Sequence, residues 1–177
     1  MNFLSIPIIF IATGCSSRLS STLSLSAKTN LSWTRYSYNF TATRVGHVLF
    51  FGIFMEKNIY ILLDDVSVVL SNDTSYELLN NPSFEDSSSS PTNWKFWCQS
   101  RCNSGSPGDI VNTYCRTGRC YKGLCRKTDG SSSSSRAEYL VQEFPTIIGR
   151  RYIVSFWFQR VRMNNNAEDA LFFSGVR

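Results

Sequence analysis

The sequence of 177 residues has a single histidine, His47, at the start of an apolar segment. Serine and cysteine nucleophiles need an activating base, and histidine is the usual one, so such chemistry would depend on this one residue. Three acidic pairs are adjacent in sequence: Asp64/Asp65, Glu85/Asp86 and Glu168/Asp169. Neighbours in a strand face opposite ways, so none of these is a glycosidase pair. A glycine-rich phosphate loop is also missing. We therefore expect no enzymatic activity.

Helical periodicity and long apolar runs are absent as well. No stretch repeats its apolar residues every three to four positions, and no apolar run reaches the roughly 18 residues that a membrane-spanning helix needs. Hydrophobic residues make up 42% of the chain and aromatic residues 14%, which is enough to bury a core. They come in short runs separated by Ser, Asn, Gly and Pro clusters. This composition predicts an all-β sandwich of antiparallel sheets.

The segment "YIVSFWFQ" (152–159) shows the alternation of a strand most clearly. Its residues Tyr152, Val154, Phe156 and Phe158 share one face, which should point into the core. The opposite face carries Trp157 and Gln159. A tryptophan on an outward face indicates that either a ligand or a loop covers it, and the loop is the commoner explanation.

Several short phrases together resemble the galactose-binding-like jelly rolls, in particular carbohydrate-binding modules of the CenC type. Such modules open with a phrase like "ELLNNPSFED" (77–86) and a tryptophan, here Trp94, and continue with strands like "YLVQEF" and "YIVSFWF". They close with strands like "YSYNFTAT" and "YILLDDVSV", which here come first. The resemblance implies a two-sheet antiparallel jelly-roll sandwich that binds glycans without cleaving them.

The closing phrases thus precede the opening ones, with residues 31–70 as the tail of a module and 74–177 as its head. Either part alone would expose unpaired strand edges. We therefore predict one circularly permuted sandwich over 31–177, in which residues 33–69 contact residues 138–177 of the same chain. In the alternative, the chain is the end of one module followed by the start of another.

The N-terminal part, residues 1–30, is expected to be a signal segment and a linker. The apolar stretch Phe3–Ala12 resembles the core of a signal peptide but lacks a preceding basic residue. It is equally explained as the cut end of a longer protein. Residues 16–30 are a linker or a frayed first strand. Three glycosylation sequons, at Asn30, Asn39 and Asn72, together with six cysteines indicate an extracellular or secreted protein.

A loop insert over residues 91–130 holds five cysteines: Cys98, Cys102, Cys115, Cys120 and Cys125. Disulfides of undetermined pairing explain them better than zinc, whose ligand spacing they do not match. From Lys95 to Lys127 the insert also carries seven basic residues, Arg116 and Arg119 among them, against the single acid Asp109. That charge suits anionic glycans, although a merely soluble loop is the simpler reading. Nucleic acid would fit the charge equally well, but the secretory features argue against it.

The candidate ligand residues are therefore aromatic, amide and basic side chains: Trp157, Gln159, Trp94, Trp97, Tyr114, Tyr121, Arg116 and Arg119. For the aromatic residues of the insert, the alternative role is packing. The resemblance also implies a structural calcium held by Glu85 with Asp64 or Asp65; otherwise these acids cap a turn and a strand bend. No other cofactor is expected. We predict a glycan-binding module whose partner is a glycan or glycoprotein, or alternatively a structural or adhesion β-sandwich without a sugar site.

Overall fold

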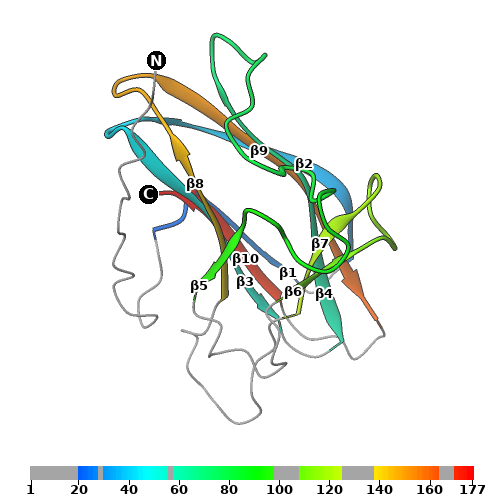
Figure 1. The fold of residues 1–177 in the computed structure, drawn as a ribbon. Coiled ribbons are helices and arrows are strands. Elements are labelled where there is room, and N and C mark those ends of the chain that lie inside the picture. Colours follow the sequence, from blue (N-terminus) through cyan, green and yellow to red (C-terminus); the bar gives the residue numbers. More distant parts are fainter. Residues whose placement is uncertain (1–19, 28–29, 56–57, 98–107, 125–137, 164–169) are drawn as a thin grey trace.

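The computed structural model describes residues 20–27, 30–55, 58–97, 108–124, 138–163 and 170–177 (Figure 1). These residues form two five-stranded antiparallel sheets packed face to face, and they include no helix. The predicted all-β sandwich is therefore confirmed, and its arrangement is compatible with a jelly roll.

Sheet A contains, in spatial order, β1 (Leu23–Ala27), β10 (Ala170–Val176), β3 (Gly46–Met55), β8 (Glu138–Pro145) and β5 (Lys95–Trp97). Sheet B contains β2 (Leu31–Thr41), β9 (Arg151–Arg162), β4 (Ile59–Leu70), β7 (Cys120–Gly123) and β6 (Gly108–Val111). The first strand, β1, has the alternating sequence "LSLSA" and lies within the segment for which a linker and a frayed strand were the two alternatives.

The N-terminal strands pair with the C-terminal ones. In sheet B, β9 lies between β2 and β4, so that Tyr36 stands opposite Phe156. In sheet A, β3 lies between β10 and β8. The predicted contact between residues 33–69 and 138–177 of one chain is thus confirmed. The phrase "ELLNNPSFED" lies against β4, because the amide of Leu78 donates to the carbonyl of Val68 at 3.0 Å.

The core between the sheets is built mainly from aromatic rings. Phe156 packs against Phe51 of β3 and Phe172 of β10, with ring centroids 5.1 and 5.6 Å apart. Phe158 and Phe172 are closer still, at 4.5 Å. The inward face predicted for β9 is confirmed, since all four of its predicted residues are at most 3% exposed. These contacts join strands from both halves of the sequence into a single core.

A bulge interrupts β4 where it passes the Cys-rich insert. Asp64 pairs with Trp157 and Ser67 with Ser155, which leaves two residues of β4 without partners in β9. The first of them, Asp65, has a left-handed backbone with φ of 44°. The second, Val66, donates its amide to the carbonyl of Pro82 at 2.9 Å. The bulge thereby joins β4 to the turn region that follows it.

Candidate ligand-binding surface

A disulfide closes the loop between β6 and β7, residues 112–119. Cys115 and Cys120 are bonded, with their Cα atoms 5.4 Å apart. Gly118 in this loop has φ of 49°, and a Cβ there would overlap the carboxylate of Glu85, so only glycine fits without strain. The disulfide prediction is confirmed for this pair. Cys98, Cys102 and Cys125 lie outside the described residues.

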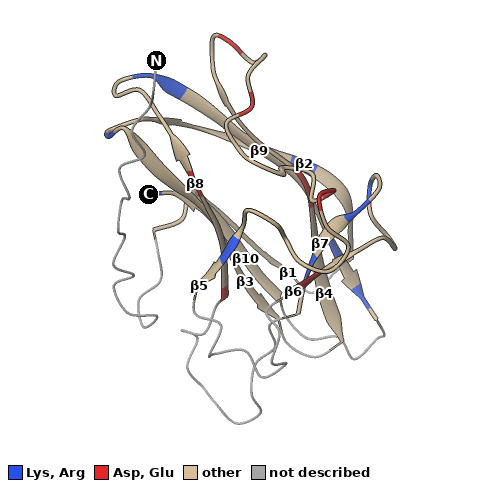
Figure 2. Cartoon of the chain, in the orientation of Figure 1, with Lys and Arg blue, Asp and Glu red and all other residues tan. Residues whose placement is uncertain are grey.

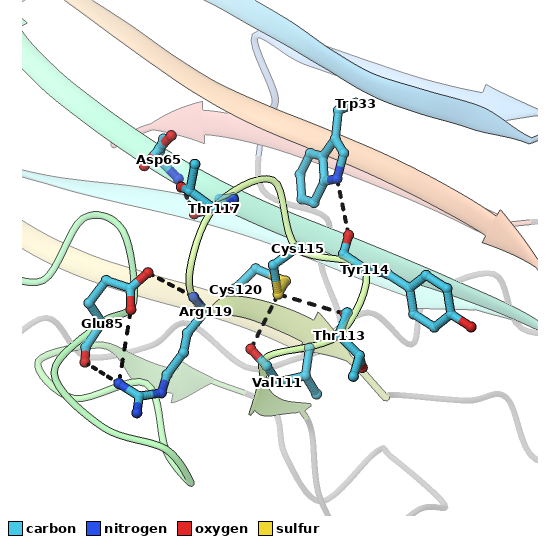
Figure 3. Close-up of a disulfide and its surroundings, with 11 residues drawn as sticks. Trp33, Asp65, Glu85, Val111, Thr113, Tyr114, Cys115, Thr117, Arg119 and Cys120 are labelled. Atoms are coloured by element: carbon cyan, nitrogen blue, oxygen red, sulfur yellow. Dashed lines mark hydrogen bonds and ion pairs between the residues drawn. A yellow bond between two sulfur atoms is a disulfide. The ribbon is translucent and has the colours of Figure 1, made fainter.

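Three carboxylates hold this disulfide loop against the sandwich (Figure 3). Arg116 forms an ion pair with Asp65, and its Nε lies 3.0 Å from Oδ2. The backbone amide of Arg119 donates to Glu85 Oε1 at 2.7 Å, and its guanidinium donates to the Glu85 carbonyl at 2.8 Å. The amide of Thr117 approaches Asp64 Oδ2 at 3.4 Å. In Figure 2 the basic residues of the loop lie beside these acidic ones, so much of the loop's charge is balanced internally.

The disulfide loop covers Trp157. The guanidinium carbon of Arg116 lies 4.5 Å from the centre of the Trp157 ring, in cation–π geometry. Of the two explanations for this outward-facing tryptophan, the structure supports the covering loop. The neighbouring Gln159 is half-buried, and its Oε1 has no hydrogen-bond partner among the described residues.

Replacing Arg116 with alanine should uncover Trp157. We expect a larger acrylamide quenching of the Trp157 fluorescence, isolated by subtracting the signal of Trp157→Phe, and a loss of about 1 kcal/mol in the free energy of unfolding. Arg119→Ala is the matched control, because it removes an arginine of the same loop that pairs with Glu85 instead. Equal quenching in the two variants would contradict the covering role of Arg116.

An aromatic surface surrounds Tyr114, an exposed residue of the disulfide loop, and includes Tyr60, which is only 8% exposed. Tyr114 is 72% exposed, and its ring lies 6.5 Å from that of Tyr60. The ammonium of Lys122 lies 4.5 Å from the centre of the Tyr60 ring. Trp33 of β2 donates its indole N–H to the carbonyl of Tyr114 at 3.1 Å (Figure 3). We call Trp33, Tyr60, Tyr114 and Lys122 the aromatic surface.

Asp64 is a fully buried carboxylate under the disulfide loop. Burial, and after it the charge of Asp65, raises its pKa from 3.8 to about 7. Hydrogen bonds from the amides of Asp65 and Thr117, and the charge of Arg116, act in the opposite direction but are weaker. The site therefore contains one carboxyl group that titrates near neutrality.

The other predicted ligand residues are placed differently. Trp94 is 7% exposed, packs on Phe84 and donates its indole N–H to the Asn81 carbonyl at 3.1 Å. Tyr121 is fully buried and donates to Glu138 Oε1 at 3.0 Å. Both rings therefore pack in the core, the alternative role that the sequence analysis gave them, and neither offers a surface on which a sugar could stack. Trp97 is half-buried on β5 at the edge of sheet A, whereas the disulfide loop joins two strands of sheet B.

The three acids of the calcium hypothesis face the disulfide loop from two sides. Asp65 pairs with Arg116 and Glu85 with Arg119, while Asp64 faces the amide of Thr117. Among the described residues no group of three His, Cys, Asp or Glu side chains is arranged to hold a metal ion. The loop thus supplies positive groups to these carboxylates, and the calcium site stays a prediction without a ligand cluster to support it.

The three sequon asparagines are exposed. Asn39 lies on β2, an outermost strand of sheet B, and Asn72 lies in the turn after β4. Asn30 accepts a hydrogen bond from the Arg162 amide at 2.7 Å through its side-chain oxygen. Glycosylation of these residues stays a prediction. None of the described segments is a helix long and apolar enough to cross a membrane.

Sequence reasoning missed Trp33 and Tyr60, and it included Lys122 only as one of the seven basic residues of the insert. Alternation along β4 could have indicated Tyr60. Tyr60, Leu62 and Asp64 lie on one face of β4, and in sheet B this is the same face on which β9 carries Trp157 and Gln159. Recognising it required the register of β4 against β9, which the sequence alone does not supply.

Comparison with known proteins gave no match, whether to a protein-family model, to a curated protein or to a solved structure. The resemblance to CenC-type modules therefore depends on the sequence phrases, and the circular permutation relative to those modules stays a hypothesis.

Proposed function

We propose that this chain is a non-catalytic extracellular glycan-binding β-sandwich whose sugar ligand stacks on Tyr114. The supporting observation is that the Tyr114 ring is exposed while its backbone is held in place. It is 72% exposed, on a backbone with φ of 63°, in a loop fixed by the adjacent disulfide and by the bond from Trp33. A bulky residue in the left-handed region is strained, and such strain clusters at binding sites. A rigid exposed ring also loses little entropy when a pyranose covers it.

The charge beside this ring favours an anionic glycan. Lys122 lies over Tyr60, next to Tyr114, and its ammonium can pair with a sulfate or carboxylate of the ligand. Arg116 and Arg119 are engaged with Asp65 and Glu85. We therefore assign the ligand charge contact to Lys122 in place of the two arginines.

A glycan array tests the proposal. Binding to a sulfated or uronic-acid glycan should weaken at least tenfold on Tyr114→Ala, which corresponds to about 1.4 kcal/mol. Tyr76→Ala is the matched control, because Tyr76 is an equally exposed tyrosine, at 71%, outside the aromatic surface. Lys122→Gln should weaken charged ligands more than neutral ones. Binding that survives Tyr114→Ala, or a blank array, would refute the proposal.

A structural or adhesion role is the second candidate. It is favoured by the internal pairing of Arg116 and Arg119 and by the covering of Trp157, which make the disulfide loop a brace for the sandwich. A blank array together with saturable binding to a protein partner would support this candidate.

A further inference from the structure

The outer face of sheet A, which points away from the core, is apolar. Its centre is a second hydrophobic cluster: Val48, Phe50, Tyr139, Val141 and Phe173. Tyr139 packs edge-on against Phe50 and Phe173, with ring centroids 6.0 and 5.6 Å apart. In β3 these outward residues alternate with Leu49 and Phe51, which belong to the main core. The strand is therefore apolar on both faces.

This outer cluster is as inaccessible as a core. Its five residues are between 0 and 5% exposed. The half-buried residues that pack against it, Trp97 and Leu171, belong to sheet A itself. An antiparallel sheet that faced water here would carry polar side chains. A further layer is therefore needed, and no described strand provides it.

The position of Ser20 indicates where this layer comes from. A Cβ built on Gly175 would lie 2.7 Å from the Phe50 ring and 3.1 Å from the carbonyl oxygen of Ser20. Ser20 thus lies against the outer face of β10, just before β1 begins at Leu23. The described part of the chain therefore begins on the face of sheet A that carries the second cluster.

The sequence leaves one candidate for the layer. Of the segments outside the described residues, 98–107, 125–137 and 164–169 are polar or charged, and 28–29 and 56–57 are dipeptides. Residues 1–19 differ, because every residue from Phe3 to Ala12 except Ser5 and Pro7 is apolar. Ten extended residues span about 33 Å, and five strands are about 19 Å wide between their outermost axes. The segment is long enough to cross the sheet.

We propose that Phe3–Ala12 docks on the outer face of sheet A and forms a third layer of the folded domain. The seven residues between Ala12 and Ser20 reach up to about 25 Å, enough to bring the segment over Val48 and Val141. The apolar N-terminal stretch then completes the second hydrophobic cluster, and the folded protein needs it to keep this cluster away from water.

Methyl-labelled NMR on the full chain tests this directly. Nuclear Overhauser contacts are expected between the methyls of Val48 or Val141 and those of Ile8, Ile9 or Ile11. The double variant Ile8→Asp/Phe10→Asp should bind the dye ANS and melt roughly 10 °C lower, since it places charges against an apolar face. Ser17→Asp is the control and should do neither.

Three results would overturn the proposal. The first is the absence of those methyl contacts in the folded wild-type chain. The second is secreted protein that begins after Ala12 and keeps both its melting temperature and its low ANS binding. The third is a concentration-dependent dimer that buries the second cluster between two copies. Because the NMR experiment uses the wild-type chain, it tests the proposal even if the double variant does not fold.

Discussion

Replacing Phe156 with alanine is expected to lower the free energy of unfolding by about 3–5 kcal/mol. Its ring is fully buried and lies 6.0 Å from Tyr36, 5.1 Å from Phe51 and 5.6 Å from Phe172, so its removal leaves a cavity between the two sheets. Denaturant titration followed by circular dichroism measures the loss. It would be a large share of the 5–15 kcal/mol that stabilises a typical domain.

The control for this prediction is Ile153→Ala. Ile153 lies in the same strand but is half-buried on the outer face of sheet B, so its loss should be clearly smaller. Equal losses would mean that Phe156 does not lie between the sheets. Tyr36 and Phe51 come from the N-terminal half, so the experiment also tests whether that half packs on β9.

The stability of the protein should fall as the pH rises from about 4 to 8, and Asp64 should be a main cause. Its pKa is raised from 3.8 to about 7 in the folded state, so the folded protein binds a proton that the unfolded chain has released. The stabilisation is fully present below the unfolded value and is lost as the pH passes the folded one. For a shift of this size the loss is on the order of 4 kcal/mol.

Asp64→Asn tests this effect. It should raise the free energy of unfolding at pH 8 and flatten its dependence on pH, since the neutral amide has no charge to bury and its one oxygen can still accept from the Asp65 amide, at 2.8 Å in the wild type; only the longer Thr117 contact, at 3.4 Å, is given up. A residual slope is expected from Glu138, whose pKa burial raises from 4.5 to about 8. Asp109→Asn, at an exposed carboxylate of β6, is the control. Unchanged pH dependence in Asp64→Asn would contradict the role of Asp64.

The inward and outward faces of β9 were predicted correctly from the local alternation of apolar and polar residues. The faces of β9 follow from "YIVSFWF" because each inward residue is large and apolar, and a strand has only two faces to assign. The pairing of the two halves followed from the cost of unpaired edges, which is a property of any sheet. These arguments need no knowledge of register.

The candidate site depends on contacts that are remote in sequence. Trp157 is covered by Arg116, and Trp33 is bonded to Tyr114, 81 residues away. Trp94 and Tyr121 come from a polar, Cys-rich region, so their composition did not show that both rings enter the core. Such placements follow from how the turn after β4 and the disulfide loop fold onto the sandwich, which no local pattern encodes.

The strand order has a consequence for the growing chain on the ribosome. No two of the strands β1 to β4 are neighbours in either sheet, and each of their partners lies at residue 120 or later. At translation rates of 5–20 residues per second, the roughly 100 residues between β2 and β9 take about 5–20 s to appear. Until residue 120 has been made, none of these four strands, the apolar β3 included, has a native partner, and β2 has none until β9 appears. Folding waits for the last strands, and long-range pairing of this kind is slow once it begins. Soluble yield should therefore depend on the chaperones that bind the nascent chain more than on the stability of the finished sandwich.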